Sequence, residues 1–367
     1  MKALMIHSED SAVGGYRIWQ QAKYLPGVGM EVKRLPNKTP ELPNDRETGE
    51  STKDAKLKFN YKKYGSWEDL AEDVDIMVLQ RSDNPQAIAL ALAIREQYNI
   101  PIVYEIDDNI YDVSENSPSY QYWYKGSPLI EVAEMFMKNV DAITTTTDEL
   151  KRVYNHLNEH IYVLPNCQDP DDWAGLKRPQ QEDKIVIGWA GGYTHYDDLK
   201  VIAPAIKRVL KNNPNVIFRV IGTLPDFLKN VKGVDFRTDA VHATMWPRKL
   251  AELDFDIGLA PVVKRPFNLG KSNIKWQEYA MLEIPTIASD IGTYGAIRNG
   301  VDGILTNNDP ANWRKAMEEL IRDEEKRRAL GVAAKQRVLE EFNISKNIGQ
   351  WNDAYREIIE RFKPLSS

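Results

Sequence analysis

Cysteine is almost absent from this chain of 367 residues, in which Cys167 stands alone. A single cysteine cannot form a disulfide within the chain and cannot build a thiolate metal site. Histidine is also scarce, with five residues, and we predict no metal site. No apolar run approaches the roughly 20 residues that cross a bilayer, and the apolar stretch in MKALMIHSED is too short for a secretion signal. We therefore expect a cytoplasmic chain without a transmembrane segment, for which peripheral contact with a membrane stays open.

An excess of positive charge is lacking as well. The 48 basic residues are outnumbered by 54 acidic ones, so the net charge is −6, which argues against binding to the phosphate backbone of nucleic acid. With 42% hydrophobic and 28% charged residues, the chain has the composition of a globular protein and is too apolar to be disordered. At roughly 100–200 residues per domain, the length predicts two domains, and this combination is typical of an enzyme.

Short β-branched runs alternate with longer amphipathic stretches along both halves of the sequence. The runs predict strands at 3–6, 75–79, 102–106, 142–145 and 161–164, and then at 185–189, 216–221, 234–237, 257–260, 286–288 and 303–305. Helical patterns such as 86–97, 129–139 and 148–157 lie between them. Strands that alternate with helices predict parallel sheets covered by helices. The expected fold class is therefore α/β, with a doubly wound sheet in each half.

A segment rich in proline and acidic residues, 165–179, separates the two sets of strands and shows no periodicity. This composition is typical of a linker. The predicted organisation is a first domain at 1–165, a linker at 166–183, a second domain at 184–343, and a C-terminal helix at 344–367 that packs across the domains. The charged stretch 39–63 also lacks a pattern, and we interpret it as a surface excursion near the cleft or a partly mobile loop.

Two pairs of glycines follow predicted strands and precede predicted helices. Gly14 and Gly15 stand in the first half, where a helix is expected from residue 16, and Gly191 and Gly192 stand in the second. Glycine lets the backbone approach a ligand, and a helix N-terminus attracts negative charge. Both pairs are therefore candidate anion sites, with a simple tight turn as the alternative. The first pair does not fit Gly-x-Gly-x-x-Gly, so a dinucleotide fold of the dehydrogenase kind is not supported.

His195 follows the second glycine pair at the start of a predicted helix. It could donate a hydrogen bond to a phosphate, or it could simply cap the helix. Asp107 and Asp108 follow the predicted strand 102–106, at the end where α/β proteins place ligands. These acids could bind Mg²⁺, act as a base or cap the loop, and we favour direct contact with a substrate.

The segment 267–290 is the strongest candidate site. A loop there precedes a predicted helix, and it contains Gly270, Lys271, Ser272 and Asn273. It is not a P-loop, because no glycine stands five residues before Gly270. Lys271, Lys275 and Glu278 are spaced i, i+4 and i+7, which predicts that they share one helix face. Two ammonium groups and a carboxylate on one face can hold a diphosphate and a diol. The alternative is a solvated face with intrahelical ion pairs.

Taken together, these segments resemble the nucleotide-sugar glycosyltransferases of the GT-B fold, in particular the retaining family 4, also called group 1. The resemblance spans nearly the whole chain, and its motifs are 140–150, 163–166, 187–192, 255–261, 270–290 and 299–303. Each motif is weak alone, and their order and spacing make the combination specific. The resemblance implies two Rossmann-like domains that face each other across a cleft.

The resemblance also assigns residues. The family has two glutamates separated by seven residues, of which the second contacts the nucleotide ribose, and Glu278 matches the second. Gly270 stands in place of the first, so the family's acidic contact to the donor sugar is missing. Lys271 and the backbone N–H groups of its loop would instead meet the phosphates. The family also usually has glycine where Glu283 stands.

The implied activity is hexosyl transfer from a UDP- or GDP-sugar to an acceptor hydroxyl, with retention and without a metal or other cofactor. The catalytic candidates are Lys271, Asp107 and His195. The donor-binding candidates are Gly191, Gly192, Gly270, Ser272, Asn273, Lys275 and Glu278, and the acceptor-side candidates are Gly14, Gly15 and Asp108.

Three other functions stay open. A nucleotide-sugar epimerase of the same fold would need no acceptor. A non-catalytic module would bind a nucleotide sugar without turnover. A nucleic-acid base glucosyltransferase is disfavoured by the net charge of −6. The acceptor itself is open among a glycan, a lipid-linked sugar, a protein and a small molecule.

Overall fold

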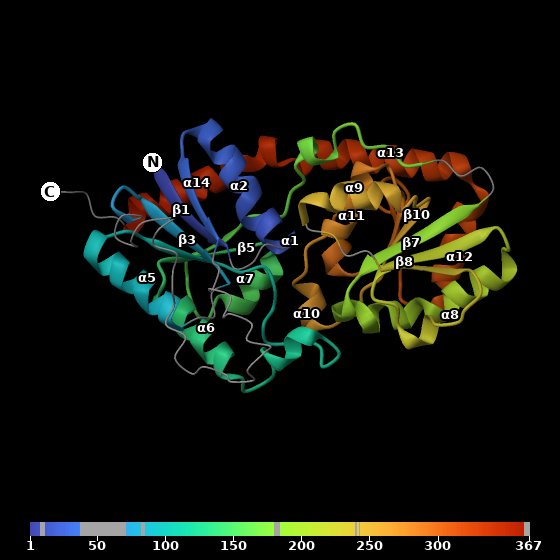
Figure 1. Ribbon diagram of the computed structural model, residues 1–367, viewed down its shortest axis with the longest axis horizontal. Helices are drawn as coiled ribbons and strands as arrows, with labels where there is room; N and C mark the ends of the chain where they lie inside the picture. Colours follow the sequence, from blue (N-terminus) through green and yellow to red (C-terminus); the bar gives the residue numbers. More distant parts are fainter. Residues whose placement is uncertain are drawn as a thin grey trace, which may run out of the picture.

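The computed structural model describes residues 1–7, 12–36, 71–81, 85–179, 184–238, 241 and 243–362. Two α/β domains lie side by side along the long axis of the molecule, each built around a parallel sheet of six strands (Figure 1). The predicted fold class is confirmed. The excursion expected at 39–63 lies outside the described residues.

The first sheet has the strand order β2-β1-β3-β4-β5-β6, and all its neighbouring strands are parallel. The strands are β1 Lys2–His7, β2 Glu31–Pro36, β3 Ile76–Gln80, β4 Ile102–Glu105, β5 Ala142–Thr145 and β6 Ile161–Val163. Helical segments of this half are α1 Ala12–Gly14, η1 Gly15–Trp19, α2 Gln20–Tyr24, η2 Leu25–Val28, α5 Pro85–Tyr98, η3 Pro118–Gln121, α6 Pro128–Asn139, α7 Asp148–Tyr154 and η4 Pro170–Trp173. Strand β2 was not predicted.

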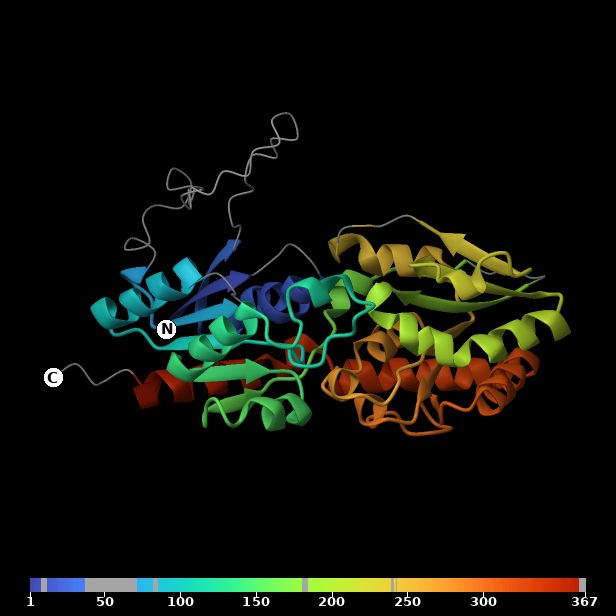
Figure 2. The same cartoon turned by 90° about the horizontal axis from the view of Figure 1, so that it is seen from below.

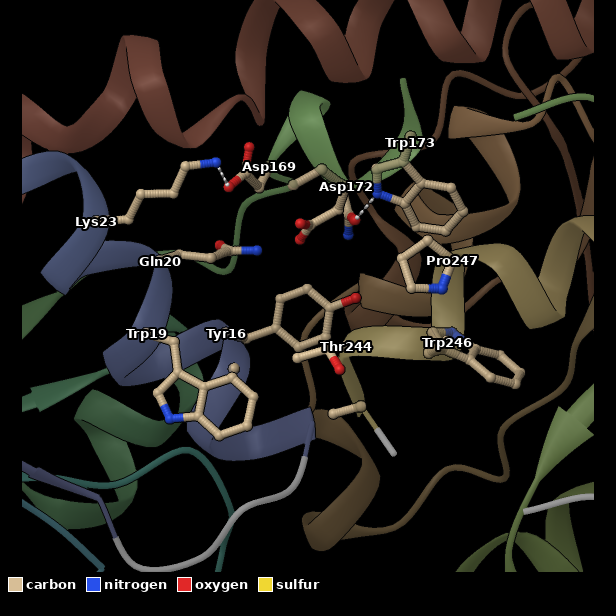
Figure 3. A pocket seen from close by; sticks show the side chains of 13 residues that line it. Tyr16, Trp19, Gln20, Lys23, Asp169, Asp172, Trp173, Thr244, Trp246 and Pro247 are labelled. Atoms are coloured by element: carbon tan, nitrogen blue, oxygen red, sulfur yellow. Dashed lines mark hydrogen bonds and ion pairs between the residues drawn. The ribbon is translucent and has the colours of Figure 1, made fainter. Parts of the chain in front are cut away.

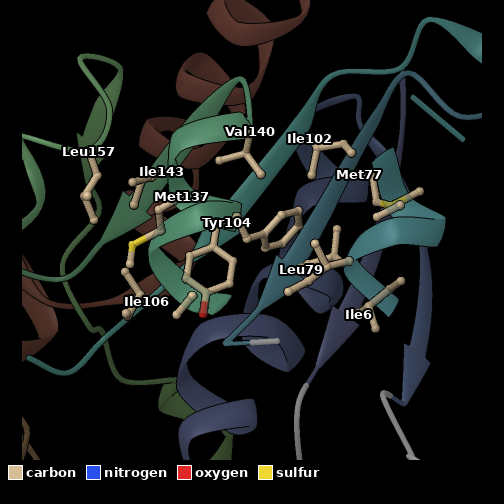
Figure 4. Close-up of a cluster of buried hydrophobic side chains, with 14 of the residues drawn as sticks. Ile6, Met77, Leu79, Ile102, Tyr104, Ile106, Met137, Val140, Ile143 and Leu157 are labelled. Carbon is tan, nitrogen blue, oxygen red and sulfur yellow. The ribbon is translucent and has the colours of Figure 1, made fainter. Parts of the chain in front are cut away.

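Alternate residues of each central strand enter different cores, because successive side chains of a strand point to opposite faces. Leu4 and Met77 pack with helices α5, α6 and α7 in the cluster shown in Figure 4. Met5 and Val78 pack on the other face, against the segment from η1 to η2 and against α14. Both faces of the sheet are covered, which explains the continuous apolar runs in the sequence.

The second sheet has the order β12-β11-β10-β7-β8-β9 and is also fully parallel. Its strands are β7 Ile185–Gly191, β8 Val216–Gly222, β9 Val234–Arg237, β10 Ile257–Ala260, β11 Thr286–Ser289 and β12 Ile304–Thr306. The helical segments are η5 Tyr193–His195, α8 Tyr196–Asn212, η6 Asp226–Leu228, η7 Ala243–Met245, α9 Trp246–Glu252, α10 Pro266–Leu269, α11 Ile274–Met281, η8 Gly292–Tyr294, α12 Pro310–Arg322 and α13 Glu324–Glu341. Helices α8 and α12 cover one face, and α9, α11 and α13 the other.

Two long helices at the C-terminal end of the chain run along one side of the molecule (Figures 1 and 2). Helix α13 packs on the second domain through Ala334 and Val338. Helix α14 (Ile344–Phe362) returns to the first domain, where Ile348, Trp351 and Ile358 join its core. The helix expected to pack across both domains therefore packs on the first, and it is the pair α13 and α14 that spans the molecule.

Local sequence sets where the helices near the domain interface begin. Helix α7 starts after Thr147, whose hydroxyl accepts a hydrogen bond from the Leu150 N–H at 3.2 Å, as an N-cap residue does. The helix expected from residue 16 instead begins at Ala12, so Gly14 and Gly15 lie inside helical turns. Its turns from Gly15 to Trp19 are π-helical, a form that often marks functional sites.

Candidate active site

The strand order of the second sheet reverses beside its first strand, because β7 lies between β8 and β10. In open α/β sheets, ligands bind at such a switch point, outside the carboxyl ends of the strands. Gly191 ends β7, and the chain after β10 leads through α10 to Lys271. The glycine pair, His195 and Lys271 therefore come together at this crevice, although they are separated by up to 80 positions in the sequence.

Lys271 and His195 are in direct contact. The Lys271 ammonium lies 3.5 Å from His195 Nε2, and His195 Nδ1 lies 2.8 Å from the carboxylate of Asp198. Burial, reinforced by the charge of Lys271, lowers the pKa of His195 to about 3, so the ring is neutral. This network favours the tautomer that donates from Nδ1 to Asp198, which leaves Nε2 as an acceptor for Lys271. In this arrangement Nδ1 of His195 faces Asp198 and Nε2 faces the Lys271 ammonium.

Asp198 is itself fixed from two sides. Its Oδ1 accepts hydrogen bonds from the Val263 N–H at 2.7 Å and from the Asn268 side chain at 2.8 Å. Both donors belong to the chain between β10 and Lys271. The carboxylate therefore ties the start of α8 to the loop that carries the lysine, and its position is determined by groups on both sides of the crevice.

Lys275 and Glu278 lie on α11, whereas Lys271 precedes the helix, which begins at Ile274. The three side chains were expected on one helix face, and that geometry is corrected: the loop turns Lys271 toward the end of β7. Lys275 reaches the same strand, because its ammonium donates to the Ala190 carbonyl at 2.5 Å. Burial lowers the pKa of Lys275 to about 8 and also lowers the pKa of Lys271.

Glu278 meets the first domain. Its Oε1 accepts a hydrogen bond from the Tyr16 hydroxyl at 2.7 Å, between residues 262 positions apart in the sequence. Burial raises the pKa of the Glu278 carboxyl, and burial together with this carboxylate raises the pKa of Tyr16 well above its usual value. The Tyr16 hydroxyl thus binds one oxygen of Glu278, the carboxylate that the family resemblance assigns to the ribose.

The loop before α11 is also held by the first domain and by the start of the linker. Thr147 donates to the Gly270 carbonyl at 3.0 Å, and Asn166 donates to the Ser272 hydroxyl at 2.9 Å. A Cβ atom on Gly270 would lie 2.8 Å from Leu150 of the first domain, too close for any larger residue without a shift. A larger residue at this position would therefore require the Leu150 side chain to move. Asn273, the residue before α11, is buried and accepts a hydrogen bond at 2.8 Å from Gln277 of that helix.

The glycine pair after β7 differs from the pair in the first helix. A Cβ atom on Gly191 would lie 2.5 Å from the Trp189 ring, whereas Gly192 is exposed and meets nothing within 4 Å. Gly192 therefore leaves room at the mouth of the crevice. Gly14 and Gly15 have helical surroundings instead, and the turn expected at the first pair is not formed there.

Asp107 and Asp108 follow β4 and face the lysine loop from the first domain. Arg81 bridges them, with Nη1 at 3.3 Å from Asp107 and 3.2 Å from Asp108. The negative charge of Asp108 acts on the Lys271 ammonium across the interface. Burial and the charge of Asp108 raise the pKa of Asp107 to about 6.

The raised pKa of Asp107 makes a prediction for stability. The Asp107 carboxyl has a pKa near 4 in the unfolded state and near 6 in the folded state. Between these values the folded state holds more protons than the unfolded state, so the free energy of unfolding falls as the pH rises from about 4 to 6. Asp107→Asn should remove this loss, and the stability of the variant relative to wild type should grow by up to about 3 kcal/mol between pH 4 and pH 7. Urea denaturation at pH 4.5, 5.5 and 7.0 measures it, and a difference independent of pH would contradict it.

Several residues of the site were missed from the sequence. Asp198 could have been found, because it stands three positions after His195 at a helix start, where side chains meet. Tyr16 and Asp112 could not, because their partners are distant in the sequence. Asp112 accepts hydrogen bonds from Arg265 Nε at 3.0 Å and from the Phe267 N–H at 2.9 Å, and so clamps the lysine loop to the first domain.

Two cavities flank these contacts. One, of about 390 Å³, borders Lys271, Ser272 and Asn273 on the side of α7. The other, of about 210 Å³, lies between the first helix, the linker and α9, and Tyr16 forms part of its wall (Figure 3). Lys271 therefore borders the larger cavity. Tyr16, which donates to Glu278, borders the smaller one.

Within the described residues, no group of three or more histidine, cysteine, aspartate or glutamate side chains is placed to hold a metal ion. His156 and His160 have the spacing His-x-x-x-His, but α7 ends at Tyr154, before both of them. The helices that the structure describes also include none long and apolar enough to cross a membrane.

The second domain matches a known family. Residues 184–323 match the model of the family described as glycosyl transferases group 1. This match covers the switch-point crevice, with Gly191, His195, Lys271 and Glu278. No curated protein sequence matches the chain.

Solved structures extend the likeness to the whole chain. The sucrose-phosphate synthase of Thermosynechococcus elongatus is 14% identical, with a TM-score of 0.63, over 98% of this chain and 100% of that one. Anabaena HepE in complex with UDP and glucose is 12% identical, with a TM-score of 0.64, over 97% of this chain and 100% of that one. The catalytic domain of Arabidopsis thaliana starch synthase IV, bound to ADP and acarbose, is 13% identical, with a TM-score of 0.68, over 98% and 100%.

At such low identity these structures establish the fold, which is GT-B, and the family match adds the class of the second domain. The resemblance stated from the sequence is thereby confirmed. The chain has the GT-B fold, and residues 184–323 of its second domain match the group 1 glycosyl transferases.

Proposed function

We propose that the protein transfers a hexosyl group from a nucleotide-sugar donor to an acceptor hydroxyl, with retention and without a metal ion. The observation that carries the proposal is the pair of ammonium groups at the switch point. Neither Lys271 nor Lys275 has a carboxylate within 4.0 Å among the residues that the structure describes. Burial lowers the pKa of both. Such a site favours an anion that enters from outside, because an anion would restore the stability of both charges.

The leaving diphosphate is the anion that suits this arrangement. When a nucleotide sugar reacts, the bond between the sugar and the diphosphate breaks, and negative charge grows on the diphosphate. Lys271, Lys275 and the N-terminal end of α11 converge where that charge would develop, and fixed groups of this kind stabilise a transition state without reorganisation. Gly192 leaves space for the phosphates at the mouth of the crevice. Closure of the two domains would exclude water from the donor.

The other two parts of the proposal are supported by the family resemblance. Retaining members of this family need no protein nucleophile. Asp107 and Asp108 of the first domain, whose charges act on Lys271, are bridged by Arg81, and we assign them to the acceptor side. The donor nucleotide of the proposal is a uridine or guanosine diphosphate, and the acceptor class is left to experiment.

The proposal is tested by a screen of nucleotide sugars. Thermal shift measurements identify the donor that stabilises the full chain, and mass spectrometry then follows the products with and without candidate acceptors. We expect nucleoside diphosphate release that depends on an acceptor and persists in EDTA. Conversion of the donor alone would indicate an epimerase, binding without turnover a non-catalytic module, and loss of activity in EDTA that Mg²⁺ or Mn²⁺ restores would place a metal in the reaction.

Glu278 is expected to bind the ribose hydroxyls of the donor. Glu278→Gln keeps the shape of the side chain and removes its charge, so it should weaken nucleotide binding by at least about 1 kcal/mol. Isothermal titration with the donor's nucleoside diphosphate measures the loss. Tyr16→Phe is the matched control, because it removes the same interdomain hydrogen bond and keeps the carboxylate; it should not weaken binding. Equal affinities of Glu278→Gln and wild type would show that the motif does not act as in the family.

A further inference from the structure

The chain passes between the two domains at two places, and these two crossings touch. The first lies between Leu164, in a core of the first domain, and Trp173, in a core of the second. The other lies between Phe342 and Ile344, which pack in the second and the first domain respectively. The Gln168 N–H donates to the Phe342 carbonyl at 2.7 Å, and the Gln168 carbonyl accepts from the Ile344 N–H at 3.0 Å. A rotation of one domain against the other would therefore displace this shared point least.

The side chain of Gln168 connects this point to the helix that carries Glu278. It is almost completely buried, and its Oε1 accepts a hydrogen bond from Trp173 Nε1 at 3.1 Å. Its Nε2 donates to Gln277 Oε1 at 3.4 Å. Gln277 lies on α11 and is completely buried. Two amide side chains thus join the crossings to the interior of the second domain.

The amide of Gln277 continues this chain of hydrogen bonds to the lysine loop. Its Nε2 donates to Asn273 Oδ1 at 2.8 Å and to the Asn166 carbonyl at 3.0 Å. Asn166 in turn donates from its own side chain to the Ser272 hydroxyl at 2.9 Å. Ser272 and Asn273 follow Lys271 directly in the sequence. Gln277 therefore holds the loop of Lys271 in a fixed place relative to the domain crossings.

The amide at 277 stands in an apolar setting. Trp276, Tyr279 and Ala280, its neighbours on α11, all belong to the core of the second domain. A buried amide must recover its lost hydration through hydrogen bonds, so it contributes less net stability than its number of contacts suggests. A buried polar network whose members are paired instead specifies one arrangement of the groups that it joins. The arrangement specified here is that of the lysine loop.

The position of this loop matters for the chemistry. The Lys271 ammonium stabilises the leaving diphosphate only if it lies where negative charge develops, and a displacement of about 1 Å in an active site can cost about 10²-fold in rate. His195 contacts the ammonium itself at 3.5 Å, but the backbone of the loop needs supports of its own. Gln277 and Asn166 supply them through the two residues that follow the lysine.

We propose that Gln277 is a positioning residue for the reaction, which acts on Lys271 through Asn273 and ties the lysine loop, by way of Gln168, to the point about which the domains turn. The inference rests on the proposed function, because it takes Lys271 as the group that stabilises the diphosphate. Turnover is thereby coupled to the relative position of the two domains, whereas the affinity for the nucleotide is not.

The test is Gln277→Met in the full chain, which keeps an unbranched side chain of similar length and removes the three hydrogen bonds of the amide. We expect the turnover number to fall about tenfold, with the dissociation constants for UDP and GDP within twofold of wild type. Small-angle X-ray scattering with and without nucleotide should match wild type, because the bridge between the crossings is made by the backbone of Gln168.

Two further variants complete the design. Gln336→Met, on the exposed surface of α13, is the matched control and should leave turnover unchanged. Gln168→Met should also lower turnover, and combined with Gln277→Met it should lower turnover by less than the product of the two single effects, because residues that act through one another are not additive.

Two results would overturn the positioning role. In the first, Gln277→Met turns over within twofold of wild type. In the second, nucleotide affinity and the melting temperature fall together with turnover, which would make the amide a structural residue only. Independent effects of the two glutamines would disprove the link to the domain crossings. If wild type itself shows no transfer with any donor and acceptor, the proposed function fails, and this inference fails with it.

Discussion

Replacing Lys271 by alanine should lower the turnover number by about 10²-fold or more, the range seen when a group that stabilises developing charge is removed. The ammonium is held by His195 and lies beside Lys275 at the end of β7. The diphosphate gains charge as the glycosidic bond breaks, so the lysine should act more strongly on the transition state than on the bound donor. Donor affinity should therefore change less than turnover.

Steady-state kinetics of Lys271→Ala, with donor affinity measured separately, checks this expectation. Lys264→Ala is the matched control, because Lys264 lies in the same connection after β10 and is exposed. It should leave both constants unchanged. A Lys271→Ala enzyme within about threefold of wild type in turnover and in donor affinity would show that Lys271 is a structural lysine.

The largest effect on stability is expected at the Arg17–Glu105 ion pair. Arg17 Nε and Nη2 donate to the two oxygens of Glu105 at 2.7 and 3.0 Å, and Nη1 donates to the Leu164 carbonyl at 2.6 Å. Both side chains are almost completely buried. Arg17→Met would leave the Glu105 carboxylate charged and without its cation, which typically costs about 3–5 kcal/mol.

Chemical denaturation followed by circular dichroism measures this loss in the transition of the first domain. Arg152→Met is the control: Arg152 lies on α7 of the first domain and pairs with Glu149, but its side chain is 68% exposed, so its loss should cost less than about 1 kcal/mol. The double variant Arg17→Met/Glu105→Leu should recover part of the stability, because it leaves no unpaired charge. Equal free energies of unfolding for Arg17→Met and wild type would show that the ion pair is energetically neutral.

Most of the fold could be predicted because both faces of each sheet are buried. Strands such as β4 and β10 are entirely buried and appear in the sequence as continuous apolar runs. Strand β2 was missed because it lies at the edge of its sheet. Its sequence, Glu-Val-Lys-Arg-Leu-Pro, carries the charges that an exposed edge requires and so lacks the apolar signal.

The candidate site was predictable in its parts and less so in its geometry. The sequence placed Lys271 on the helix of Glu278, whereas the chain turns before Ile274. Glu283 has a φ of 55°, in the left-handed region. The family usually has glycine at this position, and glycine adopts this conformation without steric cost. The contacts that unite the domains, such as Tyr16 with Glu278, have no local signal, since they arise only when distant segments fold.

The return of α14 to the first domain has a consequence for how the protein is made. Domains usually fold in the order in which the ribosome releases them, the N-terminal one first. Here Trp351, Tyr355 and Ile358 complete one core of the first sheet, and they are synthesised after the whole of the second domain. The first domain thus keeps an apolar face uncovered until α14 has been synthesised. The second domain, whose helices all precede residue 342, is able to finish folding earlier, so the order of completion is the reverse of the order of synthesis.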